Sequence, residues 1–246
     1  MFETMKQVGI GTVQAGAAAI LFVFLISGVE GGRPVTSEAA IHSSPANLGD
    51  LKSHITEYKR SGSYDRDVAA VLSSAQAYIA SRASVVSKPA IVLDIDETSL
   101  SNWAQIQAND YGRFSTGPCD LPVGPCGQAN WFARAEAEAI QPTLALFNSA
   151  KLMGVAVFFI SGRSETVREA TEANLRKAGF EDWTALIMRA RGTSTPFTAD
   201  YKAPERAKIE ARGFSIIANI GDQPSDLSGG KAERTFLLPN PFYRIP

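Results

Sequence analysis

The stretch Ala90–Thr98, with the sequence AIVLDIDET, decides the fold of this chain. It begins with apolar and β-branched residues, which are typical of a buried parallel strand. Three acids then follow within four positions, Asp94, Asp96 and Glu97. Because ligands of open α/β sheets bind outside the carboxyl ends of strands, these acids are expected at a binding site. Two neighbouring carboxylates repel each other unless a cation neutralises them, and Mg²⁺ prefers such oxygen ligands. An ordinary acidic turn fits the same pattern, so other stretches must decide.

The composition indicates one sizeable domain. Of 246 residues, 45% are hydrophobic and 20% are charged, which suits a large core and excludes general disorder. A net charge of −1 and the lack of a dense basic run argue against binding of a nucleic-acid polymer. The two histidines, His42 and His54, both precede the acidic strand. A phosphohistidine phosphatase or a Ser-His-Asp hydrolase is therefore not favoured, because each needs a central histidine.

The first thirty residues resemble a targeting segment. Lys6 precedes an uncharged apolar run, Ala15–Val29, as in the hydrophobic region of a secretory signal. Counted from Val8, the run is also long enough to span a bilayer. Residues 1–30 are therefore expected to be a signal peptide or a membrane anchor, which predicts a periplasmic or secreted protein. It would touch a membrane only through this segment, if the segment stays uncleaved. Residues 31–47 form a linker rich in small residues.

Residues 48–246 are expected to form one α/β domain with a doubly wound parallel sheet. Two helices come first, and strands then alternate with helices, with glycine stops at Gly154, Gly179 and Gly213. The strands predicted after the one that begins at Ala90 are Val155–Ile160, Ala185–Ala190, Ser215–Ile220 and Arg234–Leu238. The predicted helices are 48–62, Tyr64–Ser81, Gln141–Met153, Ser164–Ala178 and Tyr201–Arg212.

An insertion of about residues 99–140 interrupts this alternation directly after the acidic strand. It contains Trp103, Tyr111 and Trp131. A segment in this position is well placed to cover a substrate as a small cap, although such dense aromatics also suit a core.

The only cysteines, Cys119 and Cys126, lie in a Pro/Gly-rich part of the insertion. A zinc site needs three or four ligands, and no histidine or further cysteine is near. A short disulfide in an oxidising compartment is the better interpretation.

Other strand ends also carry reactive groups. Ser161 ends the second predicted strand, Asp222 and Asp226 follow the fourth, and Lys202 opens the helix before it. Together with Asp94 at one sheet edge, they indicate a phosphoryl-transfer site. There, a cation bridges carboxylates and phosphate, and one carboxylate is left to attack phosphorus.

These residues resemble a known family. DIDET, FFISGR, the lysine of YK and IGDQPSD are similar, in order, to the four motifs of the haloacid dehalogenase superfamily. More narrowly, YKAPERAKIEARGFSIIANIGDQPSDL and LPNPFYRIP look like the acid phosphatase family of plant vegetative storage proteins and bacterial class C acid phosphatases. The likeness covers about residues 50–246 and implies a haloacid dehalogenase-like core with a small cap.

The resemblance also implies a role for each motif residue. Asp94 would be the nucleophile, and Asp96 the general acid and later the general base. The Mg²⁺ ligands would be Asp94, Asp96 (through its backbone carbonyl) and Asp222, and Asp226 would either be a further ligand or support the metal site without binding the ion directly. The phosphate would be bound by Thr98, Ser161, Gly162 and Lys202. Trp103, Tyr111 and Arg163 are candidates for substrate contact, and Arg206 is interpreted as part of a structural ion pair.

The expected function is that of an exported, Mg²⁺-dependent acid phosphatase that hydrolyses small phosphomonoesters, nucleotide or aryl phosphates first, through an aspartyl-phosphate intermediate. A catalytically weak storage or binding protein on the same fold is the alternative, since fold does not fix function. A phosphorylated receiver domain is disfavoured, because there the acidic pair precedes the strand that carries the phosphorylated aspartate.

Overall fold

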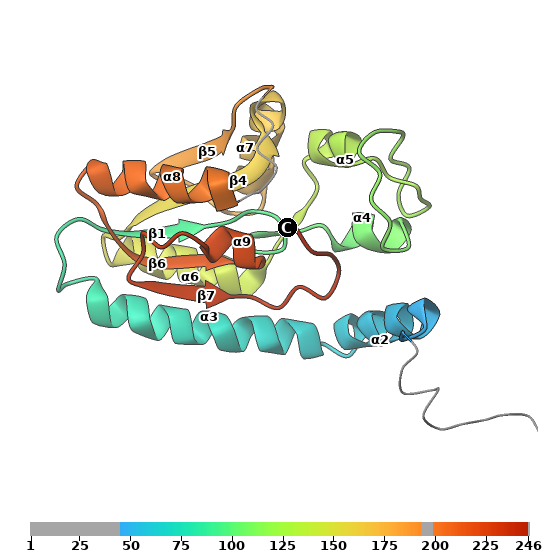
Figure 1. The fold of residues 1–246 in the computed structure, drawn as a ribbon, viewed down its shortest axis with the longest axis horizontal. Coiled ribbons are helices and arrows are strands. Elements are labelled where there is room, and N and C mark those ends of the chain that lie inside the picture. The colour runs from blue at the N-terminus through green and yellow to red at the C-terminus, as the bar shows by residue number, and fades with distance from the viewer. Residues whose placement is uncertain (1–44, 193–198, 246) are drawn as a thin grey trace, which may run out of the picture. The chain divides into compact units, whose positions relative to one another are not determined.

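The structure, a computed structural model, describes residues 45–192 and 199–245. Its centre is a five-stranded parallel sheet in the order β5-β4-β1-β6-β7 (Figure 1). The strands are β1 (Pro89–Leu93), β4 (Ala156–Ser164), β5 (Ala185–Arg189), β6 (Ser215–Gly221) and β7 (Arg234–Leu237). The chain runs outward from β1 to β5 and then returns to β6 on the other side of β1. The predicted doubly wound sheet is confirmed, and its order reverses at β1, where such sheets bind ligands.

The alternation of side chains along β1 divides the core into two layers. Ile91 and Leu93 face one side, and Ala90 and Val92 face the other, where they pack with Ile209. Helices cover both faces of the sheet (Figure 1). The helices of the first face are α3 (Ser63–Arg82), α6 (Gln141–Leu152) and α7 (Arg168–Lys177), and that of the second is α8 (Ala199–Ala211).

Residues 99–140 form a separate lobe at the carboxyl end of the sheet, called the insertion below (Figure 1). A two-stranded antiparallel ladder, β2 (Leu100–Ser101) with β3 (Glu138–Ala139), closes its base. Its helices are α4 (Trp103–Ala108) and α5 (Gln128–Arg134). The disulfide Cys119–Cys126 cross-links the loop between these two helices, as predicted.

Helix α2 (Leu48–Arg60) and α7 support the insertion from outside. The hydroxyls of Thr56 on α2 and Tyr111 are 2.6 Å apart, and Lys52 pairs with Asp110 at 2.5 Å. On the other side, the side chain of Asn174 exchanges two hydrogen bonds with the backbone of Ala137, at 3.1 and 2.7 Å. The insertion is therefore fixed to the sheet domain on two sides.

Two expectations need correction. The predicted helix Ser164–Ala178 begins later, because Ser164 still belongs to β4 and caps a short 3₁₀ turn, η1 (Glu165–Val167), before α7 starts. Arg206 is not part of an ion pair with any described residue. It is fully buried, and its guanidinium donates to the carbonyls of Asp226, Ser228 and Gly230, which ties α8 to the turn after β6.

The predicted signal or anchor segment, residues 1–30, and all but the end of the 31–47 linker lie outside the described residues. Among the residues that are described, no helix has the length and apolar character needed to cross a membrane.

Candidate active site

Asp94 stands at the carboxyl end of β1, next to Lys202 from α8. Its backbone N–H still bonds to Ile220 of β6, at 3.0 Å, so the side chain is fixed at the sheet edge. Lys202 Nζ donates to Asp94 Oδ1 at 2.5 Å and to Asp226 Oδ1 at 2.7 Å, and all three side chains are buried. Burial alone would lower the pKa of Lys202, but the two carboxylates outweigh it and raise that pKa. The ammonium therefore stays charged and holds both acids.

Asp94, Asp222 and Asp226 form a cluster that suits a divalent cation. One carboxylate oxygen from each lies within 4.8 Å of the others. Burial, followed by the charge of Asp226, raises the pKa of Asp222 to about 6, and burial also raises that of Asp94. One ammonium cannot balance three buried carboxylates, so the charge that remains fits a hard divalent metal with oxygen ligands.

Asp222 is oriented by three neighbouring donors. Thr98 Oγ1 donates to its Oδ1 at 3.0 Å, and the amides of Gln223 and Asn240 each donate to its Oδ2 at 2.7 Å. Thr98 was expected to bind phosphate, but it is fully buried behind Asp222 and does not line the cavity described below. Its observed contact is with a metal-ligand candidate.

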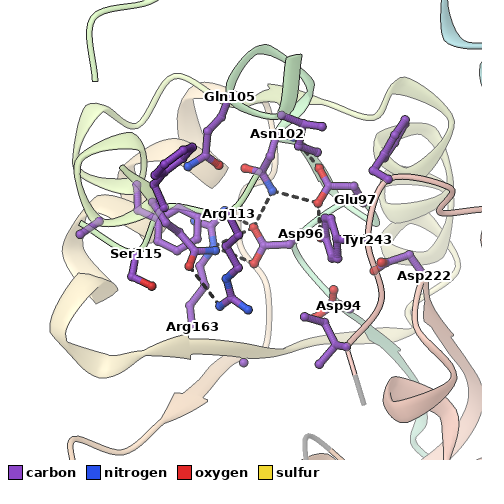
Figure 2. Close-up of a pocket in the computed structure, with 18 of the residues that line it drawn as sticks. Asp94, Asp96, Glu97, Asn102, Gln105, Arg113, Ser115, Arg163, Asp222 and Tyr243 are labelled. Carbon is purple, nitrogen blue, oxygen red and sulfur yellow. Dashed lines mark hydrogen bonds and ion pairs between the residues drawn. The ribbon is translucent and has the colours of Figure 1, made fainter. Parts of the chain in front are cut away.

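Asp96 is held by Arg163 and Asn102. Arg163 Nη2 donates to Asp96 Oδ1 at 2.7 Å, Nε lies 3.1 Å from Oδ2, and Asn102 Nδ2 donates to Oδ1 at 2.8 Å (Figure 2). Burial alone would raise the pKa of Asp96. The charge and hydrogen bonds of Arg163, together with the hydrogen bond from Asn102, outweigh burial and lower this pKa. Phe132 of the insertion stacks on the Arg163 guanidinium at 3.9 Å. Asp96 is therefore stabilised as a carboxylate.

Glu97 belongs to a buried network that the sequence did not reveal. It has a φ of 53°, which turns its side chain away from the metal cluster toward Asn102 and Tyr243 (Figure 2). Asn102 donates to it from both its backbone and its side chain, and Tyr243 donates from its hydroxyl. Burial, with the charge of Asp96, raises the pKa of Glu97 to about 8. Trp131 Nε1 completes the network by donating to Asn102 Oδ1 at 2.7 Å.

The end of β4 supplies the remaining phosphate candidates. Ser161 is fully buried and, like Thr98, does not line the cavity; its Oγ accepts the Arg163 N–H at 3.1 Å, which leaves its own hydrogen to donate. Gly162 is exposed to the cavity, and a Cβ added there would meet nothing within 4 Å. The protein itself does not need a glycine at this position, so a close ligand accounts for it better.

A cavity of about 560 Å³ opens over these residues. Asp94, Asp96, Lys202 and Gly162 line it from the sheet edge, and Tyr111 lines it from the insertion. Trp103 and Trp131 are packed away from the cavity. Trp103 lies 5.3 Å from Phe242, ring to ring, and Trp131 is buried in the network around Asn102. Of the aromatic substrate candidates, the structure thus places Tyr111 in the cavity wall and Trp103 behind it.

The sequence and the fold both match known acid phosphatases. Residues 36–246 match the family model of the HAD superfamily, subfamily IIIB (Acid phosphatase). The chain is 38% identical over 176 residues to the Stem 28 kDa glycoprotein of Glycine max, covering 69% of this chain and 66% of that one. It is 36% identical over 155 residues to Acid phosphatase 1 of Solanum lycopersicum, covering 63% and 58%.

The matched part therefore spans less than two thirds of each of these relatives. Among solved structures, a class C acid phosphatase from Bacillus anthracis with tungstate bound shares the fold. The TM-score is 0.61 at 22% identity, covering 79% of this chain and 86% of that one. The family match and the fold agree with the motif order, and the chain belongs to the acid phosphatase family of the HAD superfamily, subfamily IIIB.

Proposed function

We propose that this protein is a Mg²⁺-dependent acid phosphatase that hydrolyses small phosphomonoesters through an aspartyl-phosphate on Asp94. One observation carries the proposal. Lys202 joins Asp94 and Asp226 at 2.5 and 2.7 Å in a buried cluster of three carboxylates, at the floor of a cavity large enough for a small ester. Burying three carboxylates lowers the stability of the fold unless a bound cation compensates their charge, and such clusters are typical of functional sites.

In the first step, an Asp94 carboxylate oxygen attacks phosphorus, and the bond from phosphorus to the leaving oxygen breaks. Asp96 gives its proton to the departing alcohol. In the second step, water attacks the phosphoaspartate, Asp96 takes the water proton, and the carboxylate of Asp94 is released with phosphate. Lys202, Ser161 and the backbone at Gly162 would bind the phosphate oxygens throughout.

The metal would be held by Asp94, Asp222, Asp226 and the backbone carbonyl of Asp96. Bound Mg²⁺ would neutralise these carboxylates and draw charge from the phosphate oxygens. The surrounding residues already fix two of the ligands: Thr98, Gln223 and Asn240 orient Asp222, and the Gln223 N–H donates to Asp226 at 2.9 Å.

Arg163 would change partner during the reaction. Its pairing with Asp96 favours the carboxylate form, which suits the second step and opposes the first. When substrate enters, the phosphate offers the guanidinium a stronger bidentate partner, and Asp96 is then free to be protonated. Substrate binding would thus prepare the general acid.

The protein would act outside the cytoplasm. The Cys119–Cys126 disulfide suits an oxidising compartment, and relatives in Glycine max carry the name glycoprotein. The predicted signal or anchor at residues 1–30 would provide export. A storage role is the second candidate, because a relative of 31% identity is Vegetative storage protein 1 of Arabidopsis thaliana. Asp94, Asp96 and Lys202 argue for catalysis here.

A panel of phosphomonoesters, assayed with the full chain with and without Mg²⁺, tests the proposal. Asp94→Asn keeps the size of the side chain but removes the attacking charge, so turnover should fall by several orders of magnitude. Asp182→Asn is the matched control. The Asp182 side chain is 89% exposed, forms an ion pair with Lys151 and does not line the cavity. Turnover by Asp94→Asn close to that of the control would refute the mechanism. A folded wild-type protein without turnover on any ester would favour storage.

A further inference from the structure

Three arginines line the cavity without an acidic partner among residues 45–192 and 199–245. They are Arg113 of the insertion, Arg189 at the end of β5, and Arg244 in the segment after β7. None forms an ion pair with a carboxylate of the residues that the structure describes, whereas Arg163 in the same cavity is paired with Asp96. Arg113 and Arg244 are exposed and Arg189 is half-buried, and the part of the cavity wall formed by these three residues is called the mouth below.

The acids that line the cavity already have partners in its floor. They are Asp94, Asp96, Glu97, Asp222 and Asp226, and each accepts hydrogen bonds from the groups described above. Four of the five are less than a tenth exposed. These hydrogen bonds come from groups other than Arg113, Arg189 and Arg244, so no carboxylate of the described part of the chain holds any of the three guanidinium groups.

Arg113 is carried on a fixed part of the insertion. Phe114 and Ser115 accept backbone hydrogen bonds from the first residues of α5, at 2.7 and 3.3 Å. The guanidinium donates to Gln128 Oε1 at 3.3 Å, and this glutamine also lines the cavity. In Figure 2, Arg113 projects from the insertion into the space between Ser115 and Asp96. A neutral amide is the only polar partner that the described residues give it, so four of its five N–H groups remain free for an anion.

Arg244 and Arg189 are fixed in the same way. The neighbours of Arg244 are both anchored to the site: the Tyr243 hydroxyl donates to Glu97, and the Ile245 N–H donates to Gln223 Oε1 at 3.0 Å. Arg189 is held in the ladder of β5, in register with Ser164 of β4. Each arginine thus stands on backbone that is tied to a catalytic motif or to the sheet, which lowers the entropy cost of binding an anion.

We propose that the mouth is a second anion subsite, and that the preferred substrates carry a second anionic group, a carboxylate or a phosphate, on the leaving group. This inference rests on the proposed function, because it names the substrate class of the same cavity. The reacting phosphate occupies the floor with Lys202, and the second anion meets Arg113, Arg189 and Arg244. Guanidinium groups suit both oxyanions, since their planar forks match carboxylate and phosphate oxygens.

A series of para-substituted phenyl phosphates tests the subsite. The substituents are a neutral carboxamide, a carboxylate and a phosphonate, so the ring is constant while the second charge changes; the accompanying change in leaving-group acidity is the same for every variant compared. For the full chain with Mg²⁺ at low salt, kcat/KM should be about tenfold higher for the anionic esters than for the carboxamide. Arg113→Gln, Arg189→Gln and Arg244→Gln should each reduce this ratio about two- to fivefold, and high salt should reduce it in the wild type.

Arg60→Gln is the matched control. It removes one positive charge from an arginine whose side chain is 78% exposed on α2, away from the cavity, and the ratio should not change. A preference for phosphonate alone would assign the subsite to phosphate, and a preference for both anions would assign it to oxyanions in general. A wild-type ratio near one, or a ratio that none of the three substitutions alters, overturns the subsite.

A binding measurement separates this inference from the proposed function. Titration calorimetry with benzene para-diphosphonate and with para-carbamoylphenyl phosphonate needs no turnover. Hydrolysis of all esters without preference contradicts the subsite alone. Tighter binding of the diphosphonate, weakened by Arg113→Gln, in a protein that hydrolyses no ester would support the subsite and contradict the phosphatase. Equal binding of both ligands overturns the subsite whatever the activity.

Discussion

At the scale of the residue, Asn102 shows how much of the site depends on a side chain with no reactive group. It is 5% exposed, and its side-chain Nδ2 donates hydrogen bonds to two acids, Asp96 at 2.8 Å and Glu97 at 3.1 Å. Its carbonyl oxygen accepts from Trp131, so one residue connects the loop after β1 to the insertion. Because Glu97 and Trp131 are buried, each loses its hydrogen bond to Asn102 without replacement by water if Asn102 is shortened.

Asn102→Ala should therefore lower both stability and turnover. The free energy of unfolding should fall by about 1–3 kcal/mol, the usual cost of leaving buried polar groups unpaired, as measured by urea denaturation. Turnover should fall as well, because Asp96 loses one of the two groups that orient it. Asn130→Ala is the control, since Asn130 is exposed and makes one bond, to the Gly117 carbonyl. Equal effects of the two substitutions would contradict the role of Asn102.

The sequence predicted part of this site for a clear physical reason. Asp94, Asp222 and Asp226 follow parallel strands, and such strand ends meet at one edge, so their clustering could be expected. The hydrogen-bond network of Glu97 could not be predicted from the sequence. It depends on a positive φ at one residue and on Tyr243, which lies 146 positions away. No local pattern in the sequence encodes either feature.

At the scale of the element, the strands were predicted better than the insertion. Runs of apolar residues between glycine stops located β6 to within one residue, Ser215–Gly221 against the expected Ser215–Ile220. The insertion has little such periodicity, because its helices are short and much of it is loop. Its shape depends on long-range contacts instead, among them the Asn109 side chain, which exchanges hydrogen bonds with the backbone of Cys126 at 2.6 and 2.9 Å.

The Cys119–Cys126 disulfide should hold this element in place. Exported protein should contain no free thiol, as mass spectrometry of unreduced samples can show. Cys119→Ser with Cys126→Ser should lower stability by about 2–3 kcal/mol in the chain-entropy model for a short loop. Ser115→Ala, in the same insertion but outside the disulfide loop, is the control for a substitution that breaks no cross-link. Two free thiols in the exported protein would show this prediction to be wrong.

At the scale of the whole molecule, the carboxylate cluster links metal binding to stability. Asp94, Asp222 and Asp226 lie on segments before and after most of the sheet, so an ion shared by them would bind the folded chain and not the unfolded one. Mg²⁺ should then stabilise the protein by about 2.7 kcal/mol when its concentration is one hundred times the dissociation constant.

The corresponding rise in Tm can be followed by calorimetry with Mg²⁺ and again after chelation. Asp222→Asn should remove most of the rise, because it deletes one ligand charge, whereas Asp182→Asn should keep it. An equal rise in both variants would place the stabilising ion elsewhere in the molecule.

The long separations between contacting residues have a consequence for folding. Lys202 bonds to Asp94 across 108 positions, Asp222 to Thr98 across 124, and Tyr243 to Glu97 across 146. Contacts this distant along the chain form late, because the intervening loop must close before they contribute. A chain that has collapsed, or has formed its helices and some of its strands, still has no site. During refolding, hydrolysis should therefore return with the slowest structural phase, and specific activity becomes a direct measure of the fraction of molecules that have reached the native state.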